Sequence, residues 1–93
     1  MKDTEKAARI FKALSVETRI RMIELLKDRA LCVNALANKL GISPAGVSQH
    51  LRILRDAGAV IADKKGYYVH YRVDETTLAD WSRTAGIVLG KET

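Results

Sequence analysis

The chain has little cysteine, little proline and no long apolar run. Its single cysteine, Cys32, cannot form a disulfide within one subunit, which agrees with a reducing compartment. With one proline and no low-complexity segment, the composition is that of an ordinary globular protein. No stretch reaches the roughly 18 uninterrupted apolar residues of a membrane span, and residues 1–5 lack the apolar stretch of a signal peptide. We therefore expect a cytoplasmic protein with no membrane partner.

The 93 residues are enough for one hydrophobic core. Two cores would leave each half below roughly 50 residues, a size at which metals or disulfides are usually needed. We therefore predict a single domain over residues 1–93. The net charge is +5; residues 43–73 carry five Lys or Arg against two acids, whereas residues 74–93 carry four acids against two bases. A basic balance alone is weak evidence for nucleic acid, but the C-terminal segment is not the face that would bind it.

Apolar spacing, helix caps and glycines predict four helices in the first part of the chain. The first is expected over about 3–14, capped by Asp3, and the second follows Ser15 as N-cap, with Val16, Ile20 and Ile23 on one face. The third covers about 33–40 and ends before Gly41. The fourth starts at Ser43 and Pro44, an N-cap residue and a preferred first helical residue, and stops before Gly58.

Beyond Gly58 the apolar period changes from helical to alternating. Strands are expected over 59–62 and 67–73, joined by a turn at 63–66. Asp74 then caps a last helix over about 75–89. The order α-α-α-α-β-β-α is a mainly α fold with a small β-hairpin, a winged helix-turn-helix.

The fourth predicted helix separates into an inner and an outer face. The apolar residues at helical spacing are Val47, Leu51 and Leu54. The outer face begins with the small residues Ala45 and Gly46, which allow close approach of the backbone to a groove. Behind them Gln49 can pair with adenine, Ser48 can bond a base or a phosphate, and Arg52 can reach phosphate. The alternative is an ordinary solvated helix face.

The predicted hairpin has a basic tip. Lys64, Lys65 and Tyr67 lie at or beside the turn, where a wing follows the minor groove and phosphates. A lysine-glycine turn is also common in solvated hairpins, so this signal is weak alone. Arg72 would contact phosphate or pair with an acid. The predicted DNA-binding residues are Ser43, Ala45, Gly46, Ser48, Gln49, His50, Arg52, Lys64, Lys65, Tyr67 and Arg72.

Signals for catalysis and for a metal are weak. His50 and His70 lack a second ligand three or four residues away and a nearby cysteine, so packing or a phosphate contact is expected for them rather than metal binding. No Ser-His-Asp order, glycine-rich phosphate loop or paired carboxylate cluster stands out. We predict that the protein is not an enzyme and has neither a cofactor nor a metal.

The last predicted helix carries the only tryptophan, Trp81, on its apolar stripe. In so small a domain this helix has little to pack against, so a second copy of the chain would bury the tryptophan, with core packing as the alternative. We predict a two-fold homodimer formed by the terminal helices, about 3–14 and 75–89. The predicted interface residues are Ala7, Phe11, Leu78, Trp81, Ala85 and Val88.

The residues from Phe11 to Val73, about two-thirds of the chain, resemble the ArsR/SmtB family of dimeric winged-helix repressors. The most specific motifs are Ala13-Leu14-Ser15 before Thr18-Arg19, Leu40-Gly41-Ile42-Ser43, Val47-Ser48-Gln49-His50-Leu51 and Leu54-Arg55-Asp56-Ala57-Gly58. The resemblance implies a homodimer formed by the first and last helices. It also implies transcriptional repression at an inverted-repeat operator, with release by an effector that is often a metal ion.

The departures from the family pattern concern the effector. Where soft-metal sensors commonly have Cys-Val-Cys, this chain has Cys32-Val33-Asn34, and one thiolate makes a poor site for a thiophilic ion. The positions that resemble the zinc-type site hold Glu75, Thr77, Val88 and Lys91, of which only Glu75 could be a ligand. The effector is therefore unknown. Cys32, at a predicted helix start, is either an oxidisable thiol or a small buried apolar residue.

Taken together, the sequence predicts a sequence-specific DNA-binding transcriptional regulator. The expected form is a dimeric repressor of the ArsR type whose partner is double-stranded DNA. The alternative is a winged-helix module that binds protein through the apolar stripes of its end helices and does not read DNA.

Overall fold

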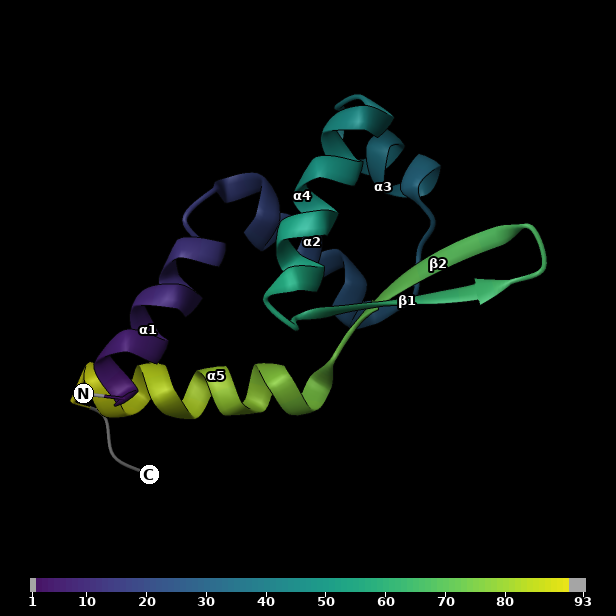
Figure 1. Cartoon of the computed structure of the whole chain (residues 1–93). Helices are drawn as coiled ribbons and strands as arrows, with labels where there is room; N and C mark the ends of the chain where they lie inside the picture. The colour runs from purple at the N-terminus through teal and green to yellow at the C-terminus, as the bar shows by residue number, and fades with distance from the viewer. Residues whose placement is uncertain (1, 91–93) are drawn as a thin grey trace.

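The computed structural model describes residues 2–90, and its elements follow the predicted order. The fold is a mainly helical winged helix-turn-helix, as predicted. Figure 1 shows a two-stranded hairpin that projects from a helical body. α5 runs along the bottom of the view, on the side away from α3, and α1 crosses the C-terminal end of α5. None of the described helices is long and apolar enough to cross a membrane. The elements are α1 (Lys2–Ala13), α2 (Glu17–Asp28), α3 (Val33–Leu40), α4 (Pro44–Asp56), β1 (Val60–Lys65), β2 (Tyr68–Val73) and α5 (Glu75–Val88).

A single apolar cluster takes side chains from all five of these helices and from both strands. The predicted inner face of α4 is confirmed, because Val47, Leu51 and Leu54 are buried. Met22 of α2 and Leu36 of α3 are equally inaccessible. Packing α3 and α2 against this stripe leaves the opposite side of α4 in solvent.

Side-chain caps fix the beginnings of α4 and α5. The Ser43 hydroxyl oxygen accepts a hydrogen bond from the Gly46 backbone N–H at 3.1 Å, and Pro44 follows as the first helical residue. The Asp74 carboxylate accepts hydrogen bonds from the backbone N–H groups of Thr76 and Thr77, at 3.1 and 3.2 Å. Both caps were predicted, since these residue types satisfy the unpaired N–H groups of a first helical turn.

The predicted caps of the first two helices are wrong. Asp3 lies inside α1. Val16 occupies the N-cap position of α2 without a side-chain hydrogen bond, while the Ser15 hydroxyl instead donates to the Lys12 carbonyl at 2.8 Å. The physical reason is that the last carbonyls of α1 also need partners, and Ser15 lies closer to them along the chain.

A buried arginine completes the corner between α1 and α2. Arg19 is 8% exposed, and its guanidinium donates to the Ala13 carbonyl at 2.6 Å and to the Lys12 carbonyl at 3.2 Å. This cation faces the negative end of the α1 dipole. Because Arg19 turns inward, the apolar face of α2 differs from the predicted one, and Ile20 is 44% exposed.

The turn of the hairpin is shifted from its predicted position. Lys65 pairs with Tyr68, so both lysines lie in β1 and the turn consists of Gly66 and Tyr67. Gly66 has a φ of 63°, a conformation that two-residue hairpin turns favour for glycine at their first position. The turn predicted at residues 63–66 is therefore wrong, because β1 stays paired with β2 for three residues beyond the predicted strand end at residue 62, through Lys65.

The chain itself buries Trp81, which corrects the expectation that a second copy would be needed for this. α1 packs on α5, and both Ala7 and Trp81 are nearly inaccessible within one chain, with Trp81 8% exposed. The second fully buried side chain of α5 is Thr84, whereas Val88 is exposed. Ala7 and Trp81 therefore have little surface left for a partner.

Candidate nucleic-acid interface

The outer face of α4 is an exposed, largely polar surface. Ala45, Ser48, Gln49 and Arg52 are exposed there, on the side opposite the buried apolar stripe. The first turns of α4 lie at the end of the molecule away from α5, with α3 beside them (Figure 1). A helix held from behind and exposed at its N-terminal turns has the geometry required for insertion into a major groove.

At the start of α4, Ser43 caps the helix and Gly46 leaves room for that cap. The exposed Ser43 uses its hydroxyl oxygen to cap the helix. A Cβ atom at Gly46 would lie 3.3 Å from that oxygen and 3.8 Å from Ile42. The absence of a side chain at position 46 therefore serves the cap, in addition to the backbone approach that the sequence suggested.

A hollow of about 400 Å³ lies between α4 and the second strand of the hairpin. It brings Ser48 and Arg52 together with a cation that the sequence-based prediction missed, Arg55. Arg55 follows Arg52 by three residues on one side of the helix, and this spacing was the signal for it. The hollow is lined by Ser48, Leu51, Arg52, Arg55, Asp56 and Tyr71.

The two histidines are half-buried rather than part of the open surface. The Nδ1 atoms of His50 and His70 are inaccessible, and neither forms a hydrogen bond with the described part of the chain. His50 lies at the edge of the polar face of α4. Its predicted DNA contact is therefore less accessible than those of Ser48 and Gln49.

The hairpin of β1 and β2, here called the wing, leaves three of the predicted residues exposed and holds the fourth in an ion pair. Lys64, Lys65 and Tyr67 are exposed near the tip. Arg72 instead donates from Nε to Asp63 Oδ2 at 2.6 Å, which is the acid pairing that the sequence left open. Exposed ion pairs are typically worth only about 0.2–1 kcal/mol, so phosphate could replace Asp63 at little cost.

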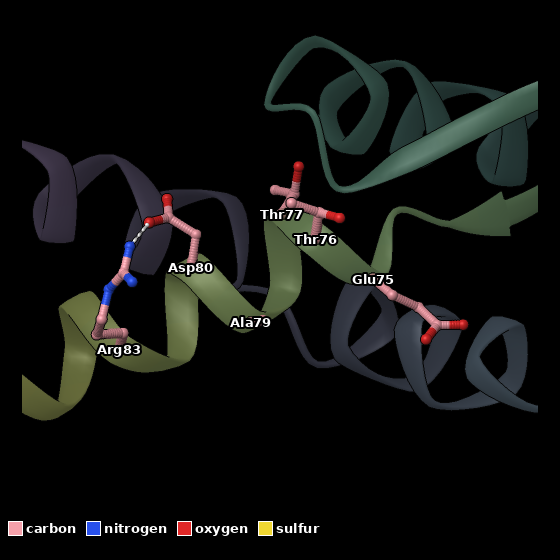
Figure 2. A pocket seen from close by; sticks show the side chains of 6 residues that line it. All are labelled: Glu75, Thr76, Thr77, Ala79, Asp80 and Arg83. Atoms are coloured by element: carbon pink, nitrogen blue, oxygen red, sulfur yellow. Dashed lines mark hydrogen bonds and ion pairs between the residues drawn. The ribbon is translucent and has the colours of Figure 1, made fainter. Parts of the chain in front are cut away.

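Another hollow, of about 660 Å³, lies along α5 (Figure 2). Figure 2 shows Asp80 and Arg83 pointing toward each other while Glu75 is directed away from them. Asp80 also pairs with Lys6 of α1. Its hydrogen bond from Lys6 is the main cause that lowers the pKa of the Asp80 carboxyl below its ordinary value; desolvation opposes this shift, and the hydrogen bond from Arg83 adds a smaller lowering effect.

No described group of three or more His, Cys, Asp or Glu side chains could hold a metal ion in residues 2–90. Glu75 and Thr77 lie at the start of α5, and Val88 is exposed at its end. Lys91, the fourth position compared with the zinc-type site, lies outside the described residues. Cys32 is half-buried at the N-cap position of α3, and both interpretations of its thiol stay predictions.

A few large apolar side chains are exposed on α1 and near the end of α5, among mostly polar neighbours. Phe11 is exposed on α1, and Ile87 and Val88 are exposed near the end of α5, with Leu89 next to them. Leu78 and Ala85 are half-buried. Of the predicted interface residues, Phe11 and Val88 thus have the most surface available to a second copy.

Comparison with known proteins finds relatives among bacterial regulators. The family described as "Bacterial regulatory protein, arsR family" matches residues 17–62. The chain is 34% identical over 71 residues to the transcriptional repressor SdpR of Bacillus subtilis, covering 76% of this chain and 79% of SdpR. It is 40% identical over 65 residues to the arsenical resistance operon repressor of Escherichia coli. That match covers 69% of this chain and only 56% of the repressor.

Among solved structures, the fold is similar to a homodimeric winged helix-turn-helix DNA-binding domain, Mb0332 of Mycobacterium bovis. The TM-score is 0.75 at 26% identity. The match covers 91% of this chain and 80% of that domain.

Proposed function

Since the chain belongs to the ArsR family of bacterial regulatory proteins, we propose that it is a repressor whose α4 reads an inverted-repeat operator. It is a winged helix-turn-helix transcriptional regulator. The observation that carries the proposal is the polar outer face of α4, where Ser48, Gln49 and Arg52 are exposed above a fully packed apolar stripe. We propose that the chain has no catalytic role and that it acts in the cytoplasm, where the DNA is.

The roles of these side chains follow from their hydrogen-bonding groups. The Gln49 amide has a donor and an acceptor that match the N7 and N6 groups of adenine in the major groove. Ser48 can bond a base or a phosphate. Arg52 lies about one turn and Arg55 about two turns farther along α4. Both can contact phosphates, which position the helix without selecting sequence.

The proposed assembly is a two-fold homodimer through α1 and α5. Support comes from the exposed Phe11, Ile87 and Val88 on these helices and from the homodimeric state of the similar domain from Mycobacterium bovis. A two-fold dimer would place two α4 helices about one helical turn of DNA apart, roughly 34 Å. Such spacing would match two half-sites of an inverted repeat.

The test is selection of bound sequences from random duplex DNA by the whole chain, followed by a variant at the proposed reading position. Gln49→Ala should cost about 1–3 kcal/mol, mainly at one base position in each half-site, because it removes a base contact and leaves the phosphate contacts. Ser82→Ala is the matched control, since Ser82 is exposed on α5. Unchanged base preference in Gln49→Ala would show that α4 does not enter the groove in this orientation.

The second candidate is a module that binds protein through the exposed apolar ends of α1 and α5. The exposed Ile87 and Leu89 favour this candidate. A salt titration separates the two functions, because DNA binding through many phosphates weakens steeply with salt while an apolar interface changes little. Selection that recovers no preferred duplex at low salt would favour the second candidate.

A further inference from the structure

The hollow between α4 and β2 holds charges of both signs. Arg52 and Arg55 line it together with the carboxylate of Asp56. All three side chains are exposed, and none of them belongs to an ion pair within residues 2–90. Opposite charges four residues apart on a helix, such as Arg52 and Asp56, commonly pair. The charged groups of this hollow are therefore available to another molecule.

The other walls of the hollow are apolar and are held in place by the fold. Leu51 is 2% exposed, and the half-buried Tyr71 packs against the apolar core. The backbone of Tyr71 is fixed on both sides, because it pairs with Ala62 of β1 and exchanges two hydrogen bonds with Leu31, at 2.8 and 3.0 Å. The hollow is therefore a preformed depression, as sites for small molecules usually are.

Contact with DNA accounts for only part of this set of side chains. Arg52, Arg55 and the Ser48 hydroxyl can all bond a phosphate, whereas the carboxylate of Asp56 repels one. The apolar walls also offer a surface that a phosphate does not use. A ligand that uses the whole set carries an anionic group, a cationic group close to it and an apolar body.

We propose that this hollow binds a free amino acid with an apolar side chain, and that the bound amino acid excludes the operator. Its carboxylate pairs with the guanidinium groups of Arg52 and Arg55, which suit carboxylate geometry. Its ammonium group pairs with Asp56, and its side chain covers Leu51 and the Tyr71 ring. The volume of about 400 Å³ lies within the range of small-molecule sites, roughly 300–1,000 Å³.

The regulatory part of this inference rests on the proposed function, because it requires that α4 binds DNA. Arg52 is exposed on the outer face of α4 and also lines the hollow. An amino-acid carboxylate and a DNA phosphate therefore compete for the same guanidinium. Such an effector acts by direct competition, and its site needs no metal.

The amino-acid site is tested without DNA, by NMR titration of the isotope-labelled chain with L-phenylalanine and L-leucine at millimolar concentrations. The amide signals of residues 48–56 and of Tyr71 should shift and saturate. Two analogues of phenylalanine separate the charges, since 3-phenylpropionate lacks the ammonium group and phenethylamine lacks the carboxylate. Each should bind at least about threefold more weakly than phenylalanine, within what an exposed ion pair contributes.

Two results would overturn the site. The first is the absence of a saturable shift with both amino acids. The second is equal affinity for phenylalanine and 3-phenylpropionate, because the proposed pairing with Asp56 requires the ammonium group.

Two variants assign the charges to their side chains. Arg55→Gln should bind phenylalanine at least about threefold more weakly, since one ion pair is lost. Asp56→Asn should lose the preference for phenylalanine over 3-phenylpropionate. Arg21→Gln is the matched control, because Arg21 is an exposed cation on α2 outside the hollow. Unchanged affinity in Arg55→Gln, or a preference that survives in Asp56→Asn, would overturn the assigned contact.

Competition is measured with the selected duplex. Phenylalanine at ten times its own Kd should raise the apparent Kd for the duplex at least about tenfold, as mass action requires for exclusive binding. Phenethylamine at the same concentration should have little effect. An unchanged Kd for the duplex at a saturated amino-acid site would overturn the competition. A chain that binds phenylalanine but no duplex would refute the proposed function instead, because the site is measured without DNA.

Discussion

Arg19 should be the most important charged side chain for the stability of the fold. Its guanidinium is 8% exposed and donates to two carbonyls at the end of α1. In Arg19→Ala, the Lys12 carbonyl keeps the hydrogen bond from the Ser15 hydroxyl at 2.8 Å. The Ala13 carbonyl loses its 2.6 Å bond to Arg19. The main loss is therefore one short, charge-assisted hydrogen bond in a buried place.

The expected magnitude follows from that single loss. Hydrogen bonds to charged groups contribute about 1.5–3 kcal/mol, so the free energy of unfolding should fall by about 2 kcal/mol in Arg19→Ala. With a urea dependence of about 1–2 kcal/mol/M for a chain of this size, the unfolding midpoint should fall by roughly 1–2 M. Arg19→Lys should lie between the two proteins, because an ammonium keeps the charge and loses the planar fork.

The assay is urea unfolding followed by circular dichroism at one fixed protein concentration, which removes effects of assembly on the midpoint. Arg21→Ala is the matched control, since Arg21 is on the same helix and is exposed. Exposed substitutions are usually within about 0.5 kcal/mol. Equal midpoints for Arg19→Ala and Arg21→Ala would refute the stabilising role of the buried guanidinium.

Three further results are expected. The lowered pKa of Asp80 means that its pairing with Lys6 and Arg83 stabilises the contact between α1 and α5 above the pKa of the unfolded chain. This contribution is lost as pH falls below about 4. The fluorescence of the neighbouring Trp81 should therefore change with pH in the wild-type chain and not in Asp80→Asn. The same acid transition in both proteins would show that Asp80 does not cause the transition. Ser43→Ala should destabilise the fold by about 1 kcal/mol through loss of the α4 cap, whereas Ser43→Asp should restore most of it; no change in the unfolding midpoint of Ser43→Ala would show that the cap contributes nothing. Phe11→Glu should shift the proposed dimer toward monomer in sedimentation, and an unchanged mass would place the interface elsewhere.

The sequence predicted helix boundaries best where the chain provides its own cap. Ser43 with Pro44, Asp74 and Gly41 each fixed an end correctly, because the capping interaction is local. Ser15 was wrongly predicted as the N-cap of α2, because a serine between two helices can bond the end of one or cap the start of the other. Its hydroxyl bonds the carbonyl of Lys12, at the end of α1.

Burial was harder to predict because it depends on contacts between distant elements. Arg19 reads as a surface residue in the sequence, and only the corner between α1 and α2 makes it a core residue. Trp81 seemed to need a second copy, but α1 packs on α5 and helps to bury it. The hairpin turn was misplaced because lysines and glycine suggest a turn locally, whereas strand pairing extends through Lys65.

The candidate interface was predicted well on α4 and less well on the wing. Helical spacing separates Ser48, Gln49 and Arg52 from the buried stripe, and the structure keeps that separation. The same spacing indicates Arg55, which was missed. The opposite orientation of Lys64 and Lys65 was missed because both were assigned to a turn at residues 63–66, whereas they are consecutive residues of β1 and so point to opposite faces of the hairpin.

The most direct test of the central claim, that α4 and the wing form a DNA-binding surface, is the salt dependence of affinity for the selected duplex. Four cations lie on this surface in each protomer: Arg52, Arg55, Lys64 and Lys65. If each contacts one phosphate, a dimer makes about eight contacts, and log affinity should fall against log salt with a slope of about −7. A slope near zero, or no duplex bound at low salt, would contradict the claim.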